Sequence, residues 1–164
     1  MAQPQDLKRF ERDPLIVATK NQQVMEAQEL ARRNGVHHMP VVDGGKLVGA
    51  VCTCDMMHCP PDTLIESIMH EPVTLASSAK PAQAAELMIQ RSVGSVLLVE
   101  NERAVGIVTR GEIVKSELDG TFDAQALRCD CCGSTEHLRK SDEGAQLCNN
   151  CQIAAAKRRH KDPH

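Results

Sequence analysis

Apolar and polar residues follow one another in an order that occurs twice, with an offset of 57 residues that takes Gly49 to Gly106. In each copy a short apolar stretch behind a proline, at 14–17 and 72–75, precedes a stretch with apolar residues three or four positions apart. Two runs of strand length then follow, at 39–42 and 47–52 in the first copy and at 96–99 and 104–109 in the second. Each copy therefore predicts the order strand, helix, strand, strand, helix.

Turn and cap residues support these elements. Gly35 is placed to end the first helix, and Pro81 suits the first residue of the third. Asp43-Gly44-Gly45 has the glycines of a tight hairpin, and Thr63-Leu64-Ile65-Glu66 predicts a capping box that starts a short helix between the copies. Because three strands and two helices cannot cover both faces of their own sheet, we expect an α/β (α+β) fold with two β-α-β-β-α repeats related by a pseudo-twofold axis.

The copies share one phrase, GAVCTCD at 49–55 and GIVTRGE at 106–112. Both run from glycine through apolar residues to a carboxylate and lead into a second helix. Two of the differences between the copies fall at candidate ligand positions, since Cys52 stands where the second copy has Thr109, and Asp55 where it has Glu112. We therefore expect two quasi-equivalent but unequal pockets.

Residues from about 8 to 120 resemble a tandem pair of CBS domains, the Bateman module. The resemblance is carried by His38-Met39-Pro40-Val41-Val42-Asp43, by the doubled phrase, and by Ile65-Glu66-Ser67-Ile68-Met69 before the second repeat. In this family the paired domains form a cleft that commonly binds adenosine-containing ligands such as AMP, ADP, ATP or S-adenosylmethionine. The resemblance implies a homodimer, a regulatory role and the same class of ligand.

The resemblance also implies the contacts of each candidate residue. Asp55 stands at the position that accepts hydrogen bonds from ribose hydroxyls, and Glu112 offers the same charge one methylene further out. The hydroxyl of Thr109 and the guanidinium of Arg110 are candidates for phosphate, while Cys52 replaces the hydroxyl residue of the first repeat. Apolar residues of the proline-bearing strands, among which we place Pro40, would enclose the adenine. The alternative is a dimerisation scaffold that binds no nucleotide.

Eight cysteines give a second signal, because four of them match a metal site. Cys129 and Cys132 form one CxxC pair, Cys148 and Cys151 form another, and fifteen residues separate the pairs. Four thiolates at this spacing suit a structural Zn²⁺ ion, and the segment resembles a zinc ribbon. Cys131 is surplus, since Gly133 favours Cys132 as the partner of Cys129. A rubredoxin-type iron centre and a set of free thiols are the alternatives.

Composition and charge limit the function further. Only Phe10 and Phe122 are aromatic, so the core must consist of Val, Leu, Ile, Met and Ala, and platforms for base stacking are lacking. The net charge of −3 divides into −5 for residues 1–127 (12 basic, 17 acidic) and +2 for residues 128–164 (7 basic, 5 acidic). The sequence has no apolar run of membrane-span length and no signal peptide, so we expect a cytoplasmic protein without membrane contact.

These observations predict a regulatory protein without enzymatic activity, because no nucleophile–base pair or glycine-rich phosphate loop is present. The rival is a nucleic-acid-associated regulator, or a scaffold, that acts through the ribbon and the basic tail. Cys54, His58 and Cys59 are expected to pack as ordinary side chains. The predicted parts are a lead-in (1–12), repeat 1 (13–59), a linker helix with repeat 2 (60–120), a linker (121–127), the ribbon (128–152) and a basic tail (153–164).

Overall fold

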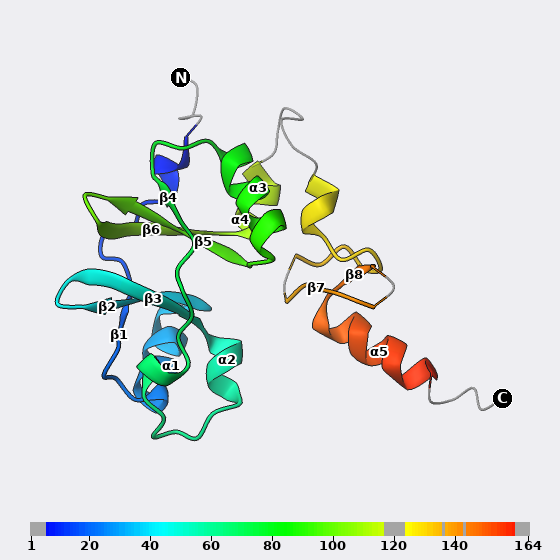
Figure 1. Cartoon of the computed structure of the whole chain (residues 1–164), viewed down its shortest axis with the longest axis horizontal. Helices are drawn as coiled ribbons and strands as arrows, with labels where there is room; N and C mark the ends of the chain where they lie inside the picture. The colour runs from blue at the N-terminus through cyan, green and yellow to red at the C-terminus, as the bar shows by residue number, and fades with distance from the viewer. Residues whose placement is uncertain (1–5, 117–123, 136, 143, 160–164) are drawn as a thin grey trace. The chain divides into compact units, whose positions relative to one another are not determined.

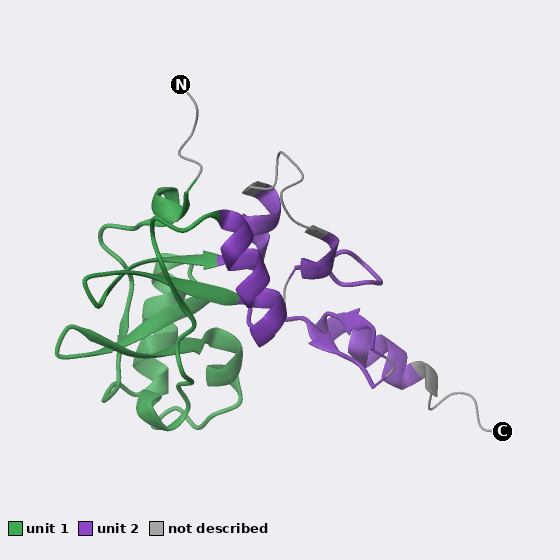
Figure 2. Cartoon of the chain, turned by 45° about the horizontal axis from the view of Figure 1, so that its top comes forward, with its two compact units in different colours: residues 1–80, 95–108 green, residues 81–94, 109–164 purple. Residues whose placement is uncertain are grey.

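The computed structural model describes residues 6–116, 124–135, 137–142 and 144–159. The chain forms two compact units (Figure 2). Unit 1 consists of residues 1–80 and 95–108, and unit 2 of residues 81–94 and 109–164. The second repeat therefore contributes its strands to unit 1 and its helices to unit 2.

Unit 1 contains a three-stranded sheet from the first repeat (Figure 1). The strands are β1 (Ala18–Thr19), β2 (His38–Asp43) and β3 (Lys46–Cys52), in the order β1-β2-β3. β1 is parallel to β2, and β2 is antiparallel to β3. Gly44 and Gly45 have φ of 57° and 81°, so the predicted glycine hairpin between β2 and β3 is confirmed.

A second sheet in unit 1 repeats this order with β4 (Thr74–Ala76), β5 (Ser95–Glu100) and β6 (Arg103–Thr109). β4 is parallel to β5. Its hairpin has no glycine, and Asn101 and Glu102 take φ of 49° and 65° instead. The Ser77 hydroxyl is buried and donates a hydrogen bond of 2.6 Å to Glu100 Oε1, which connects the end of β4 to the end of β5.

Helices α1 (Val24–Asn34) and α2 (Thr53–Met57) complete the first repeat. Gly35 ends α1 in the left-handed region with φ of 63°, as predicted. The core below them consists of aliphatic and methionine side chains, as the near absence of aromatic residues requires: Ala18, Val24, Ala27, Ala31, Met39, Val41, Val51, Met56 and Ile65.

The segments that precede the two repeats are exchanged between the sheets of unit 1. The first contains the 3₁₀ helix η1 (Leu7–Phe10), after which Glu11 forms an antiparallel bridge with Gly106 of the second repeat. The second contains the 3₁₀ helix η2 (Ile65–Ser67), after which His70 forms an antiparallel bridge with Ala50 of the first repeat. The segment that leads into each repeat thus forms a β-bridge with the sheet of the other repeat.

Unit 2 contains α3 (Pro81–Arg91), α4 (Arg110–Ser116) and the cysteine-rich segment. The latter begins with the 3₁₀ helix η3 (Ala124–Leu127), continues with the antiparallel strands β7 (Arg139–Lys140) and β8 (Gln146–Leu147), and ends in α5 (Asn149–Arg159). α3 and α4 pack on each other, and η3 packs on both.

The order β-α-β-β-α is confirmed in both repeats, and the fold class is mixed α and β. Two local predictions are wrong. The first strand is Ala18–Thr19 and not the stretch behind Pro14. Thr63 does not cap η2, because the amides of Ile65 and Glu66 bond to the backbone carbonyls of Gln22 and Lys20. Within the described residues, no helix combines the length and the apolar character that a membrane crossing needs.

Candidate functional site

The first copy of the doubled phrase lies where β3 passes into α2. The strand ends at Cys52, so Asp55 falls in the first turn of the helix. The Cys52 thiol donates a hydrogen bond of 3.2 Å to Asp55 Oδ2. The Asp55 side chain is exposed, and the described residues provide no further hydrogen bond to its carboxylate. This carboxylate can therefore accept hydrogen bonds from a ligand.

The Cys52 side chain acts as a donor because it stays protonated. Burial raises the pKa of the Cys52 thiol to about 11. The backbone N–H of Asp55 opposes this rise, and the Asp55 carboxylate adds to it. At neutral pH the Cys52 side chain is therefore an uncharged thiol.

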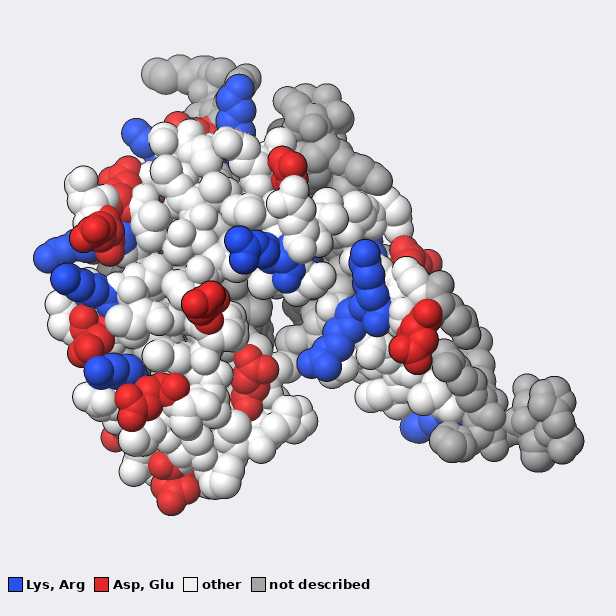
Figure 3. Space-filling view, viewed as in Figure 1, with Lys and Arg blue, Asp and Glu red and all other residues white. Residues whose placement is uncertain are grey.

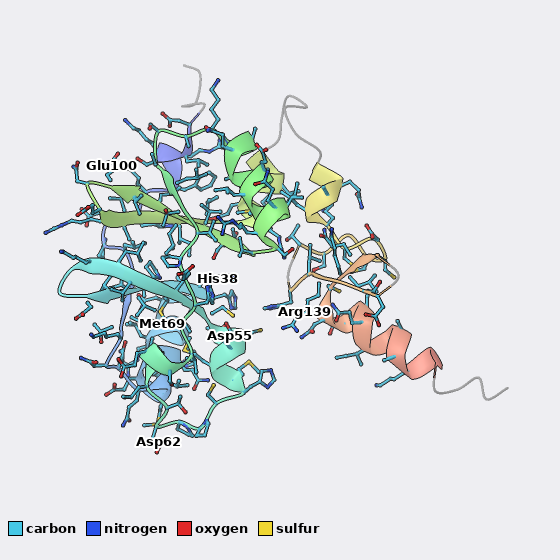
Figure 4. The ribbon with its side chains drawn as sticks, viewed as in Figure 1. His38, Asp55, Asp62, Met69, Glu100 and Arg139 are labelled. Atoms are coloured by element: carbon cyan, nitrogen blue, oxygen red, sulfur yellow. The ribbon has the colours of Figure 1, made fainter. Side chains whose placement is uncertain are left out.

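Neighbouring side chains complete this end of the first sheet. His38, at the start of β2, pairs with Cys52, and Figure 4 shows His38 and Asp55 at the same end of the sheet. Thr53 is the first residue of α2, and its hydroxyl lies 3.4 Å from His37 Nδ1. Cys59 Sγ donates to the backbone carbonyl of Asp55 at 3.3 Å, so Cys59 packs against α2 as expected.

Gly49, the first residue of the phrase, is in contact with the side chain of Met69. A Cβ atom at Gly49 would lie 2.7 Å from Met69 Sδ, so any larger residue would require the Met69 side chain to shift. Met69 belongs to the segment that leads into the second repeat and packs against the core of the first. The structural reason for this glycine is therefore the approach of Met69.

The second copy of the phrase forms a capping box at the start of α4. Glu112 Oε2 accepts hydrogen bonds from the Thr109 backbone N–H at 3.0 Å and from the Thr109 hydroxyl at 3.3 Å. The Glu112 backbone N–H lies 3.4 Å from Thr109 Oγ1 and donates to it. Both side chains thus bond to the helix terminus and to each other, as in other capping boxes.

Arg110 follows Thr109 and is almost completely buried, with 6% of its surface exposed. Burial lowers the pKa of the Arg110 guanidinium, although arginine stays protonated at neutral pH. Its backbone N–H donates to Gly94 O at 3.1 Å. Within the described residues its side chain forms no hydrogen bond or ion pair, and no buried side-chain nitrogen lacks a partner, so the guanidinium nitrogens reach solvent.

The four cysteines of the tail come together as predicted. The sulfur atoms of Cys129, Cys132, Cys148 and Cys151 all lie within 4.8 Å of one another. Cys131 is exposed and lies outside this set. Cys129 and Cys148 are buried and form a small core with Leu138, on which Leu147 packs.

The geometry of the sulfurs suits a tetrahedral ion. Four sulfurs at about 2.3 Å from a Zn²⁺ ion lie about 3.8 Å apart. Cys132 Sγ and Cys148 Sγ are separated by 3.6 Å. The residues present therefore fit a metal ion with four thiolate ligands.

Titration of the thiols agrees with a cation site. Burial would raise the pKa of Cys129, but backbone N–H groups of Cys132, Cys148 and Cys131 donate to its sulfur and lower the pKa to about 6. The pKa of Cys151 is raised instead, first by the neighbouring Cys148 side chain and then by that of Cys131. Only a cation allows all four thiols to be charged at once.

A model of the CBS domain matches this sequence twice, over residues 7–62 and 64–119. The chain belongs to the CBS domain family. The two matches include both copies of the phrase and both exchanged lead-ins, and they leave the four-cysteine segment outside the pair.

Relatives share the CBS pair with longer proteins. The inosine-5′-monophosphate dehydrogenase of Korarchaeum cryptofilum is 28% identical over 106 residues, which are 63% of this chain and 22% of the relative. The L-aspartate semialdehyde sulfurtransferase of Methanocaldococcus jannaschii is 31% identical over 105 residues, which are 61% of this chain and 21% of the relative. The chain thus spans about a fifth of the length of these curated relatives.

A solved CBS pair has the same fold. The crystal structure of the CBS domain pair of protein MJ0100, in complex with 5′-methylthioadenosine and S-adenosyl-L-methionine, is 29% identical to this chain with a TM-score of 0.63. The match covers 68% of this chain and 94% of that one.

The structure places the CBS site candidates in three local groups. Cys52 and Asp55 are in direct contact at α2, and Thr109, Arg110 and Glu112 form the first turn of α4. Pro40 lies in the middle of β2 opposite Ala50, where it is buried.

Sequence reasoning missed the exchanged lead-ins and the place of Met69. A signal existed, because the offset of 57 residues that aligns the phrases also aligns Leu7 with Leu64, at the start of each lead-in.

Proposed function

We propose that this chain is a non-enzymatic regulatory protein that binds an adenosine-containing ligand through its CBS pair and a structural zinc ion through its four cysteines. The observation that carries the ligand proposal is the Asp55 carboxylate, which is exposed and, among the residues that the structure describes, receives one hydrogen bond, from Cys52. Two vicinal ribose hydroxyls donate to such a carboxylate, and charged acceptors give the stronger hydrogen bonds.

Arg110, which belongs to unit 2, is a separate candidate for contact with an anion. Its side chain is largely buried, its guanidinium nitrogens reach solvent, and it has no carboxylate partner within the described residues. A phosphate, or the carboxylate of an adenosyl amino acid, supplies the missing charge. Glu112 contributes less to binding, since its carboxylate already accepts from Thr109.

The ligand class is further supported by the related CBS pair that was crystallised with 5′-methylthioadenosine and S-adenosyl-L-methionine. Both ligands contain an adenosine whose ribose carries two vicinal hydroxyls. This feature is common to AMP, ATP and S-adenosylmethionine. It therefore defines the ligand class as adenosine-containing, and the group attached to the adenosine is what the experiment must identify.

The direct test is a calorimetric titration of the purified chain with 5′-methylthioadenosine, S-adenosylmethionine, AMP and ATP. We expect Asp55→Asn to weaken the best ligand about 10- to 100-fold, since a hydrogen bond to a charged group contributes about 1.5–3 kcal/mol. Asp62→Asn is the matched control, because Asp62 is also an exposed aspartate of unit 1 but lies away from Asp55 (Figure 4).

Two results would contradict the ligand proposal. One is the absence of heat with all four ligands. The other is an equal loss of affinity in Asp55→Asn and Asp62→Asn, which would show that charge alone attracts the ligand. A chain that binds no nucleotide would leave the scaffold function.

The zinc ion is proposed for the four thiolates alone, which fill a tetrahedral shell and leave no position for a substrate. We expect Cys148→Ala to lose the metal, and Cys131→Ala to retain one equivalent because Cys131 lies outside the set. Elemental analysis of both purified variants measures the ratio of zinc and of iron to protein. Equal metal content in the two variants would disprove the assignment of the ligands.

The charge balance of the tail makes nucleic-acid binding the second candidate. Residues 128–164 carry a formal charge of +2 (7 basic, 5 acidic) before the metal site is counted. Four thiolates with one Zn²⁺ ion add −2, which brings the segment to zero. On the face shown in Figure 3, positive and negative side chains are interspersed. Association with DNA or RNA should therefore be weak and depend only slightly on salt.

A further inference from the structure

The metal segment contacts the second phrase within unit 2. A Cβ atom at Gly111 would lie 3.3 Å from Thr135 Oγ1, so the Thr135 side chain rests on α4 at this glycine. Gly111 stands between Arg110, whose side chain is largely buried, and Glu112, which caps the helix. The contact thus lies within the turn that carries the ligand candidates of the second repeat.

Thr135 belongs to a closed loop that begins at a metal ligand. The Cys129 backbone N–H donates to Ser134 O at 2.7 Å, and the Gly133 N–H donates to Cys129 O at 2.9 Å. Arg128 Nη1 donates to Gly133 O at 3.1 Å. The position of Thr135 is therefore tied to that of the Cys129 and Cys132 sulfurs.

A second contact joins the same two parts. The 3₁₀ helix η3 packs on α3 and α4, and Leu127 at its end is 1% exposed. Gln146 of β8 donates through Nε2 to Ala126 O at 2.7 Å and to Arg128 O at 3.0 Å. The strand beside the metal ligand Cys148 thus holds the helix that packs on α4.

We propose that metal in the four-cysteine site positions the Thr109–Glu112 turn through Thr135 and η3. The ribbon has a core of a few apolar side chains beside its cysteines, so its loops depend on the ion for a fixed geometry. Removal of the metal releases Thr135 and η3 from α4, and the turn that holds Arg110 and Glu112 becomes mobile. Metal binding and the state of this turn are therefore coupled.

The coupling extends to ligand affinity, a step that rests on the proposed function. If the metal holds the turn in the conformation that binds the ligand, the metal-loaded chain binds more tightly. Linkage then requires that the ligand increase the affinity for metal by the same factor. A factor of about 5 to 150 is the usual range for such coupling.

The first experiment uses the full chain without any nucleotide. Hydrogen–deuterium exchange is measured on the zinc-loaded protein and on the protein after chelation. We expect amides of α4 and η3 to exchange about tenfold faster or more without metal, while those of α1 keep their rates. Unchanged exchange in α4 would overturn the proposal.

The second experiment measures the coupling factor and the role of Thr135. S-adenosylmethionine and ATP are titrated into loaded and depleted protein, and zinc affinity is measured by competition with a chromophoric chelator, with and without nucleotide. We expect Thr135→Ala to keep one equivalent of zinc. In this variant, the factor by which zinc changes nucleotide affinity and the factor by which nucleotide changes zinc affinity should both fall towards one. Thr74→Ala, an exposed threonine on β4, should leave both factors unchanged.

The outcomes separate the two proposals. Faster exchange in depleted α4 without binding of any nucleotide would disprove the ligand proposal and retain the positioning of α4 by metal. Nucleotide binding with the same affinity in loaded and depleted protein would retain the ligand proposal and disprove the coupling. Retention of the full coupling factor in Thr135→Ala would disprove the Thr135 path.

Discussion

The two copies of the phrase share a pattern, from glycine through apolar residues to a carboxylate, and have different physical roles. In the first, a protonated thiol bonds to an exposed aspartate, which remains open to a ligand. In the second, threonine and glutamate bond to each other and cap a helix, beside a buried arginine.

One methylene explains most of this difference. A glutamate three residues after the cap is long enough to reach back to the cap's backbone N–H, whereas the shorter Asp55 side chain accepts a hydrogen bond from the Cys52 thiol. The second copy therefore stabilises its own helix, and the first keeps its carboxylate for other partners. A motif that is shared between repeats thus need not indicate two equal binding sites.

Substitution of the glycine in each copy should give the largest difference in the free energy of unfolding. A Cβ atom at Gly106 would lie 2.5 Å from the Phe10 carbonyl oxygen, and the backbone of the lead-in cannot move aside cheaply. At Gly49 the obstacle is the flexible Met69 side chain. We expect Gly106→Ala to lower the free energy of unfolding by about 2–3 kcal/mol and Gly49→Ala by about 1 kcal/mol.

Urea denaturation of both variants, followed by circular dichroism, measures this difference. Equal losses would mean that the lead-in at Phe10 gives way as easily as a side chain, and the exchange of lead-ins would then contribute little to stability.

Substitutions at the first residues before α2 and α4, Cys52 and Thr109, should differ less in their effect on the free energy of unfolding. Thr109→Ala removes the hydroxyl of a capping box, and we expect a loss of about 1 kcal/mol. Cys52→Ala removes a weaker thiol donor, so the loss from the hydrogen bond should be a few tenths of a kcal/mol. Thermal denaturation of the two variants compares them, and a larger loss for Cys52→Ala would show that packing of the thiol exceeds capping.

The smallest expected effect concerns the chemical reactivity of the Cys52 thiol. Because burial raises the pKa of Cys52 from 9.0 to about 11, roughly fifty times less thiolate is present at pH 9 than in an ordinary cysteine of pKa 9.0. Alkylation by iodoacetamide, followed by peptide mass spectrometry, should be correspondingly slow. Asp55→Asn removes a carboxylate that raises this pKa, so alkylation should accelerate, whereas Asp62→Asn should have no effect.

The same shift predicts the sign of a pH effect on stability. The folded chain holds the Cys52 proton more tightly than the unfolded chain, so this contribution is fully present below about pH 9 and is lost as the pH rises towards 11. An alkylation rate typical of an exposed cysteine would disprove the burial of this thiol.

The sequence by itself determined the repeat, the order of its elements and the four-cysteine set, because these depend on local periodicity and spacing. The glycine at position 35 and the pair at 44 and 45 ended their elements as their conformational freedom predicts. The choice of Cys132 over Cys131 followed from the turn that Gly133 permits.

Only the tertiary structure decided which groups the site residues contact. Thr63 does not cap η2 as predicted, because the backbone amides of η2 donate instead to the distant carbonyls of Gln22 and Lys20. The cover of Gly49 by Met69, and the contact of Thr135 with Gly111, join residues more than twelve positions apart. Such contacts depend on how the chain returns on itself, which local patterns do not encode.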